Sequence, residues 1–274
     1  MQAMVRELPQ PDRDRLSVLT ALVLLAYTLL RIVVLPTLTA EFSLLGLLIR
    51  LELNTRMVLL SLSAALTVAG VDWLIRAHPW YQPNQPTVEH WVVPGLAALG
   101  AGAILARIPE GPGWWLGLVL AASLLIAVLA TEFIVLDPDD PRYDGASVGL
   151  TALSYLLLVG ALFATWATGL RATFAIPLVL AACTAVAWRL LRLQQPQSPV
   201  LTHAALIGIA TSEIAWALHY WPIPPLRVSL LLGLGVYLGT GLALAHLRRE
   251  MNRATALEFS AVAAVALFGI LILS

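Results

Sequence analysis

The chain has 274 residues, of which 59% are hydrophobic and only 12% are charged, and its mean hydropathy is +0.85. A soluble domain is about one quarter charged, so this composition excludes the soluble globular class and indicates a membrane protein. The net charge is zero and the 16 basic residues, all arginine, are scattered, which argues against nucleic-acid binding and excludes a lysine Schiff base. A single cysteine, Cys183, excludes an internal disulfide and a cysteine-based metal site.

The chain begins with a polar tail, residues 1–15, which is followed by an apolar run over 16–36. The run is longer than the hydrophobic region of a signal peptide, and we interpret it as a first, uncleaved membrane span. Residues 40–53 are also apolar, but they carry Glu41, Arg50 and Glu52 and are shorter than the roughly 20 residues that a span needs. The sequence therefore predicts an interfacial helix over 40–53 that lies flat on the membrane.

Eight further apolar segments have the length that a bilayer requires: 57–77, 90–107, 114–136, 147–169, 173–192, 200–221, 226–247 and 255–273. The loops between them are short and rich in proline, glycine and aspartate, so none can form a soluble domain. The predicted fold class is an all-α integral membrane protein, a polytopic bundle of about nine transmembrane helices plus one interfacial helix. Residues 16–274 are expected to form a single transmembrane helical domain.

Arginine is distributed unevenly between the two sets of alternate loops. The set that includes the tail holds the majority, and this asymmetry favours a cytoplasmic N-terminus. We therefore expect a multi-pass protein of the bacterial cytoplasmic membrane, with Ser274 on the far side.

Four acids lie inside predicted spans. Glu258 is about one turn from the start of the last span and is interpreted as an anchor at its end, which leaves Asp72, Glu132 and Glu213. Arg76 is four residues after Asp72, and an ion pair on one helix face would satisfy both. Glu132 has only apolar neighbours on its own face, so it needs a partner on another helix or a proton.

Glu213 is the deepest of these acids, about two turns from one end of its span and three from the other. It shares a face with Trp216 and Tyr220, whereas His219 lies on another side of the helix. A hydrogen bond from a neighbouring helix and a ligand- or proton-handling role are both open for Glu213.

The span 226–247 contains Gly235 and Gly239, a Gly-x-x-x-Gly pattern that is typical of closely packed membrane helices. The partner is expected to be the span 200–221 or a second copy of the chain, which would make a homo-oligomer.

Residues Gly145-Ala146-Ser147-Val148-Gly149 fit the Gly-x-Ser-x-Gly pattern, and His203 begins a later span. The pair resembles the serine and histidine of rhomboid intramembrane proteases, and the resemblance would imply a serine nucleophile. Val148 departs from the rhomboid pattern, and the alternative role for Ser147 is the N-cap of its helix.

The loop after the fourth predicted span contains Asp137, Asp140 and Asp144. Carboxylates that are close together can bind Mg²⁺ or Ca²⁺, and Asp140-x-x-x-Asp144 resembles half of the metal-diphosphate motif of nine-span isoprenoid transferases. The second aspartate-rich loop of those enzymes is missing, and a solvated, turn-rich loop is the alternative.

The segment Glu213-x-x-Trp216-x-Leu218 is followed by Pro222, Tyr237, Gly241, Arg249 and Glu258. This C-terminal third resembles an uncharacterised family of bacterial polytopic membrane proteins, and the resemblance implies a class without a mechanism.

These observations favour a carrier or binding unit for a small molecule, a lipid or protons, with its site among the fourth, seventh and eighth spans. Glu213, Glu132, Asp72 and His203 are the candidate ligand- or proton-handling residues. The alternatives are a membrane-embedded enzyme that acts on a lipid or isoprenoid diphosphate and a structural subunit. Membrane lipids are the expected surroundings, and no cofactor is predicted.

Overall fold

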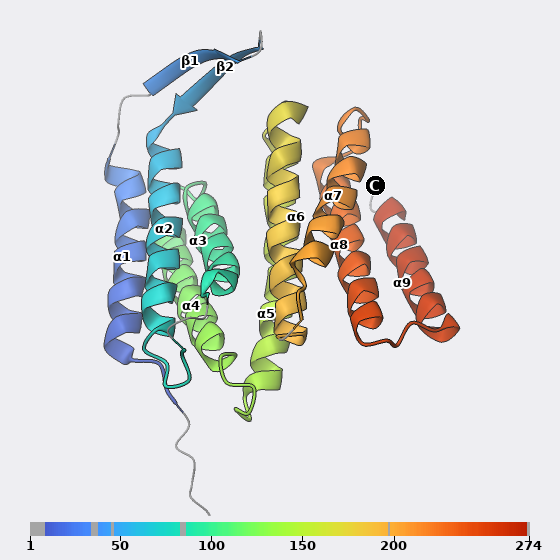
Figure 1. Cartoon of the computed structure of the whole chain (residues 1–274). Helices are drawn as coiled ribbons and strands as arrows, with labels where there is room; N and C mark the ends of the chain where they lie inside the picture. Colours follow the sequence, from blue (N-terminus) through green and yellow to red (C-terminus); the bar gives the residue numbers. More distant parts are fainter. Residues whose placement is uncertain (1–8, 34–37, 45–46, 83–85, 197, 273–274) are drawn as a thin grey trace, which may run out of the picture. The chain divides into compact units, whose positions relative to one another are not determined.

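The structure is a computed structural model that describes residues 9–33, 38–44, 47–82, 86–196 and 198–272. Its contacts divide the chain into two compact units, Met1–Ala146 and Ser147–Ser274, which we call unit 1 and unit 2 (Figure 1). The prediction of a single helical domain concerns the association of these two units, and it stays a prediction.

Unit 1 contains four long helices and one short one: α1 (Arg13–Ile32), α2 (Thr55–Ile75), the 3₁₀ helix η1 (Val88–Trp91), α3 (Val92–Leu105) and α4 (Pro112–Ile134). Unit 2 contains most of α5 (Tyr143–Ala167), followed by α6 (Ala172–Gln194), α7 (Leu201–His219), α8 (Pro225–Leu247) and α9 (Arg253–Ile272). Within the described residues, nine helical segments, with η1 and α3 counted as one, are long and apolar enough to cross a membrane. The nine predicted spans are therefore confirmed as helices, with ends that differ by a few residues.

Local sequence signals explain several of these ends. The side chain of Asp12 accepts a hydrogen bond from Asp14 N–H at the start of α1, and Asn54 accepts one from Met57 N–H at the start of α2. Gly111, at φ +146°, precedes Pro112 at the first position of α4. The helix α5 begins at Tyr143, so Ser147 lies inside the helix, and the predicted N-cap role of Ser147 is wrong.

The prediction of an interfacial helix over 40–53 is also wrong. Residues Leu38–Leu44 form strand β1 and residues Leu47–Leu53 form strand β2, and the two pair as an antiparallel hairpin. The register pairs Phe42 with Ile49 and Thr39 with Glu52. Polar residues alternate with apolar ones throughout β1 and over residues 49–53 of β2, which is the period of a strand and not of a helix.

The hairpin also decides how the chain passes from α1 to α2. Its strands run in opposite directions, so the chain returns to the end of unit 1 at which α1 finished (Figure 1). The expectation that this region does not cross the membrane stays a prediction, with a hairpin in place of the helix.

Close helix packing and a buried hydrogen bond hold α1 against α3 in unit 1. The Tyr27 hydroxyl on α1 donates a 2.6 Å hydrogen bond to the Ala98 carbonyl on α3, and Tyr27 is 1% exposed. A side chain at Gly102 would meet the Tyr27 ring at 2.7 Å, so the small residue permits this approach. These contacts fix α3 against α1, and α3 also packs on α2 and α4.

Glycine allows close approach at several helix contacts in unit 2. A Cβ at Gly208 on α7 would lie 3.2 Å from the Leu180 carbonyl oxygen on α6, and one at Gly239 on α8 would lie 3.1 Å from Ile207 on α7. A Cβ at Gly233 would lie 2.7 Å from Val159 on α5. The predicted close packing of the eighth span on the seventh is thus confirmed at Gly239.

Gly235 differs from its neighbour in the Gly-x-x-x-Gly pattern. A Cβ there would lie 4.0 Å from the Thr211 hydroxyl, which is an ordinary contact. The close approach predicted for both glycines therefore holds for Gly239 alone. Its contact is with Ile207 of the same chain.

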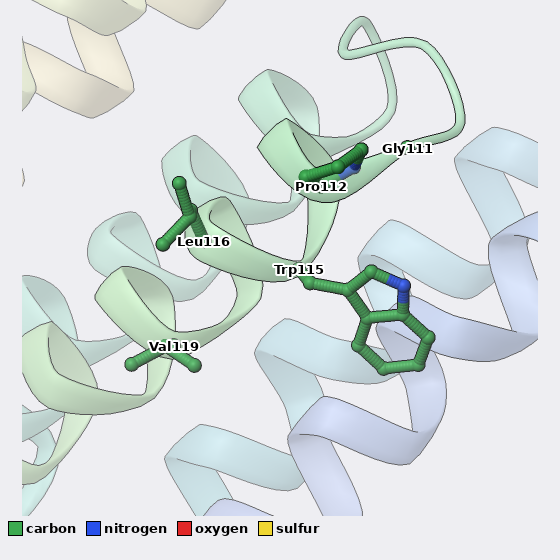
Figure 2. Close-up of a pocket in the computed structure, with 5 residues that line it drawn as sticks. All are labelled: Gly111, Pro112, Trp115, Leu116 and Val119. Carbon is green, nitrogen blue, oxygen red and sulfur yellow. The ribbon is translucent and has the colours of Figure 1, made fainter.

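A shallow apolar hollow of about 610 Å³ lies on the outer face of α4 (Figure 2). It is lined by residues near the start of that helix: Gly111, Pro112, Trp115, Leu116 and Val119. Trp115, Leu116 and Val119 are each more than 60% exposed, and the Trp115 indole supplies the only side-chain polar group of the lining. This surface suits contact with lipid chains and offers little to orient a polar ligand.

Gly208→Ala should destabilise the folded protein by about 1–3 kcal/mol, because the new methyl group would overlap the side chain of Thr184 and press on the backbone of α6. Gly235→Ala is the matched control on α8, with an expected change within about 0.5 kcal/mol. Thermal unfolding in detergent would compare the two variants, and equal melting temperatures would contradict this account of the α6–α7 contact.

Candidate functional site

Polar side chains gather at one end of unit 1, where α2 and α4 finish and η1 begins. This cluster, which we call the polar end of unit 1, contains Asp72, His78, Thr87, Glu89, His90, Glu132, Asp137, Asp140 and Arg142. Most of these side chains are buried, although α3 and α4 are otherwise the most apolar of the described helices. A concentration of buried ionisable groups in an apolar bundle indicates a candidate functional site.

The centre of the cluster is a hydrogen bond between His90 and Glu132. His90 Nδ1 lies 2.7 Å from Glu132 Oε2, and the two side chains are 9% and 1% exposed. Glu132 therefore has the partner on another element that its apolar neighbours required. The partner comes from η1, the short turn that precedes α3.

Glu89 lies on the other side of the same imidazole. Its Oε1 atom is 3.7 Å from His90 Nε2, and its side chain is 16% exposed. The imidazole is thus placed between two carboxylates, one fully buried and one nearer the surface. Because each ring nitrogen can either hold or accept a proton, this arrangement can exchange a proton between a deep and a shallow acid.

Asp72 has two partners, of which the sequence predicted one. Arg76 Nε donates to Asp72 Oδ2 at 2.6 Å, which confirms the predicted i,i+4 ion pair. The hydroxyl of Thr87 donates to the other carboxylate oxygen of Asp72. The carboxylate therefore connects the end of α2 to the residue that begins η1.

His78 follows α2 and is buried, with 4% of its surface exposed. Its Nδ1 atom accepts a hydrogen bond from Trp80 N–H at 3.2 Å, and its ring meets the Phe133 ring edge-on at 4.3 Å between centroids. Burial lowers the pKa of His78 below its ordinary value, and the carboxylates of Asp137 and Asp140 partly oppose this shift.

The aspartates of the loop after α4 take part in local structure. Asp137 accepts a hydrogen bond from Asp139 N–H, and the guanidinium of Arg142 contacts both carboxylate oxygens of Asp140 at 2.7 and 3.0 Å. Asp140 in turn raises the pKa of Arg142. Asp144, on the first turn of α5, is exposed. Among the residues that the structure describes, no group of three or more His, Cys, Asp or Glu side chains could hold a metal ion, and we assign no metal to this loop.

Glu213 lies in the interior of α7, as the sequence predicted, but its side chain is exposed. Trp216 and Tyr220 are 57% and 70% exposed beside it. Within the described part of the chain, no hydrogen bond or ion pair joins Glu213 to another side chain. The two intramembrane acids of the proposed site also fall in different units, Glu132 in unit 1 and Glu213 in unit 2.

His203 lies in the first turn of α7, where its ring centroid is 6.1 Å from that of His246 near the end of α8. Its Nδ1 atom is buried without a hydrogen bond among the described residues. No carboxylate is placed beside either ring by a described contact, so this histidine pair lacks the buried acid that distinguishes His90.

Sequence reasoning assigned His90 to the end of a span and did not connect it to Glu132. The two residues are 42 positions apart, and only the folding of η1 over the end of α4 joins them. Arg189 of α6 is 2% exposed, and the sequence pattern does not single it out from the other arginines.

The depressed pKa of His78 predicts how stability responds to acid. The folded protein resists protonation of this ring more than the unfolded chain does, so stability falls as the pH drops below about 6.5. His78→Asn keeps an acceptor for Trp80 N–H and removes the titrating ring. Between pH 7.5 and 5.5, the melting temperature of the variant should therefore fall by less than that of the wild type. His246→Asn, at an exposed position, is the control and should keep the wild-type slope.

Comparison with known proteins gives one match. No curated protein and no solved structure matches the chain. A family model described as a protein of unknown function (DUF5656) matches residues 35–273, which include the hairpin, the polar end of unit 1 and all but the last residue of unit 2. The match extends far beyond the C-terminal third in which the sequence resembled an uncharacterised family, and it covers most of the chain. The chain therefore belongs to the DUF5656 family.

Proposed function

We propose that this protein is a proton-handling carrier or binding unit for a small molecule or a lipid, and that its proton site is the Glu89–His90–Glu132 group. The observation that supports the proposal is the 2.7 Å contact between His90 Nδ1 and Glu132 Oε2 at a buried position. Asp72, the other candidate acid in unit 1, helps to position this site, as argued in the next subsection.

The chemistry of the site follows from its geometry. In the neutral imidazole with a proton on Nδ1, His90 gives this proton to Glu132 Oε2, and His90 Nε2 takes a proton from Glu89 Oε1. The products are a protonated Glu132, an ionised Glu89 and the other neutral tautomer of His90. One proton has then moved from the shallow acid to the buried one. The 3.7 Å gap at Glu89 must close by about 0.5–1 Å for this step.

A carrier explains why the pair is placed inside the bundle. Removing one partner of a buried charged pair lowers the free energy of unfolding by about 3–5 kcal/mol. Replacing the whole pair with apolar side chains of similar volume is often neutral or stabilising. An acid and an imidazole at this depth are therefore a poor choice for stability alone. Reversible protonation of the pair offers a reason for their presence, since its charge state can respond to a ligand or to pH.

The two other hypotheses receive less support. An enzyme of the isoprenoid type would use the Asp137–Asp144 loop, but Asp140 is engaged by Arg142 and Asp137 by the backbone of its own turn. A structural subunit would need the His90–Glu132 bond only for packing, and the experiments below distinguish that role from proton exchange.

We place the protein in a bacterial cytoplasmic membrane with its N-terminus in the cytoplasm. The nine apolar helices support the multi-pass arrangement, and the excess of arginine on the side of the tail supports this orientation. The polar end of unit 1 would then face the cytoplasm, because α2 finishes and α3 begins on the same side as the tail.

Cysteine labelling tests this orientation. In a Cys183→Ala background, Asp144→Cys and Arg253→Cys should react with a membrane-impermeant maleimide only after permeabilisation, whereas Glu110→Cys should react in intact cells. All three positions are exposed. Labelling at 144 without labelling at 253 would mean that the number of crossings between them is wrong.

Proton exchange at His90 can be measured directly. In the protein labelled with ¹⁵N-histidine, Glu132→Gln should change the ¹⁵N chemical shifts of the His90 ring, because these shifts report which ring nitrogen holds the proton. In vesicles that contain a trapped pH-sensitive dye, acid is added outside to create a pH difference across the membrane. This difference should disappear faster with the wild type than with Glu132→Gln.

Glu213→Gln is the matched control, because it neutralises the other intramembrane acid without touching the polar end of unit 1. It should keep the wild-type rate of proton entry. Equal rates for the wild type and Glu132→Gln would contradict the proposal and leave the His90–Glu132 bond a structural one. A loss confined to Glu213→Gln would move the proton site to α7.

A further inference from the structure

The short helix η1 carries both Glu89 and His90, yet little in its own sequence holds it in place. It is a single 3₁₀ turn over Val88–Trp91, and the side chain of its N-cap residue, Thr87, makes no capping hydrogen bond to it. One turn of 3₁₀ helix has poor hydrogen-bond geometry and does not persist on its own. Contacts from outside η1 must therefore fix the position of His90.

The hydroxyl of Thr87 supplies such a contact. It points away from the turn that it precedes and donates to Asp72 Oδ1 on α2, while the Thr87 carbonyl accepts a 2.9 Å hydrogen bond from His90 N–H. Thr87 is 5% exposed, so water does not readily replace either bond. A continuous path of hydrogen bonds runs from Asp72 through Thr87 and His90 to Glu132.

We infer that Asp72 and Thr87 are positioning residues that hold the His90 imidazole against Glu132. The inference rests on the proposed function and adds the parts that make its geometry possible. Asp72 suits this role because Arg76 Nε, on the same helix, fixes its second oxygen at 2.6 Å. The carboxylate is thereby oriented before Thr87 reaches it, and its charge is balanced.

The ionisable groups around His90 come from several elements. They are Asp72 and Arg76 from the end of α2, Glu89 from η1 itself, Glu132 from α4, and His78, Asp137, Asp140 and Arg142 from the adjoining loops. Thr87 is uncharged, so its replacement changes the placement of His90 without adding or removing a charge at this end of unit 1. This property makes it the best position for a test.

Thr87→Val keeps the shape of the side chain and removes the hydroxyl donor. We expect proton entry into vesicles to fall about tenfold or more, toward the rate of Glu132→Gln, because a displacement of the imidazole by about 1 Å is enough to disrupt proton transfer. The His90 ¹⁵N chemical shifts should move toward those of Glu132→Gln. Thr87→Ser retains the hydroxyl and should retain at least half of the wild-type rate.

Thr67→Val is the matched control for the loss of a buried hydroxyl. Thr67 lies on α2 and is fully buried, and its hydroxyl donates to the Ser63 carbonyl of the same helix, so we expect the rate to stay within about twofold of the wild type. A loss in Thr67→Val equal to that in Thr87→Val would contradict a specific role for the bond between Thr87 and Asp72.

If Thr87→Val does not fold, a second variant still tests the inference. The double change Asp72→Leu with Thr87→Val removes both partners at once, so that no buried acceptor is left without a donor. It carries the same expectation as Thr87→Val. A wild-type rate and wild-type His90 ¹⁵N chemical shifts in the variant that folds, with a slow Glu132→Gln, would overturn the positioning role and leave the proposed function standing. A wild-type rate in Glu132→Gln would refute the proposed function itself.

Discussion

An ionisable side chain in an apolar bundle must be given a partner, and in unit 1 this requirement is met by the bond between Glu132 and His90. The backbone of a membrane helix satisfies its own hydrogen bonds, so apolar side chains can cover it without cost, whereas a carboxylate cannot be covered in this way. The partner comes from η1, which explains why a single 3₁₀ turn precedes α3 where the chain could have entered a regular helix at once. The arrangement of this end of the molecule follows from that pairing.

The same requirement extends outward from the pair. His90 is held by the carbonyl of Thr87, Thr87 by Asp72, and Asp72 by Arg76, which reaches water. Each member satisfies the next, and the series ends at an exposed guanidinium. A buried polar network is favourable only when its members are satisfied, and here the charged member at its outer end lies where solvation is available.

Unit 2 is organised by a different constraint, the close approach of helices. Lipid chains are as apolar as leucine side chains, so membrane helices gain little from burying apolar surface and depend on the fit between their surfaces. Gly208 and Gly239 allow α7 to approach α6 and α8 at distances that a larger residue would prevent. Glu213 stands outside this packing, on an exposed face of α7 between Ile209 and Trp216, which are also exposed.

The sequence by itself determined the class of protein, the number of long apolar helices and the pairing of Asp72 with Arg76, because each depends on residues that are near one another in the chain. Hydrocarbon thickness sets the length of a span, and an i,i+4 spacing sets a helix face. The prediction from sequence was wrong at 40–53, where composition suggested a helix. The pairing of Leu38–Leu44 with Leu47–Leu53 produces a hairpin there instead. Only the tertiary structure decided that His90 meets Glu132 across 42 positions, that Thr87 reaches Asp72, and that Gly239 is closely packed while Gly235 is not. These contacts depend on the rotation and offset of one helix against another, which arise from the fit of many side chains at once and leave no periodic signal in the sequence.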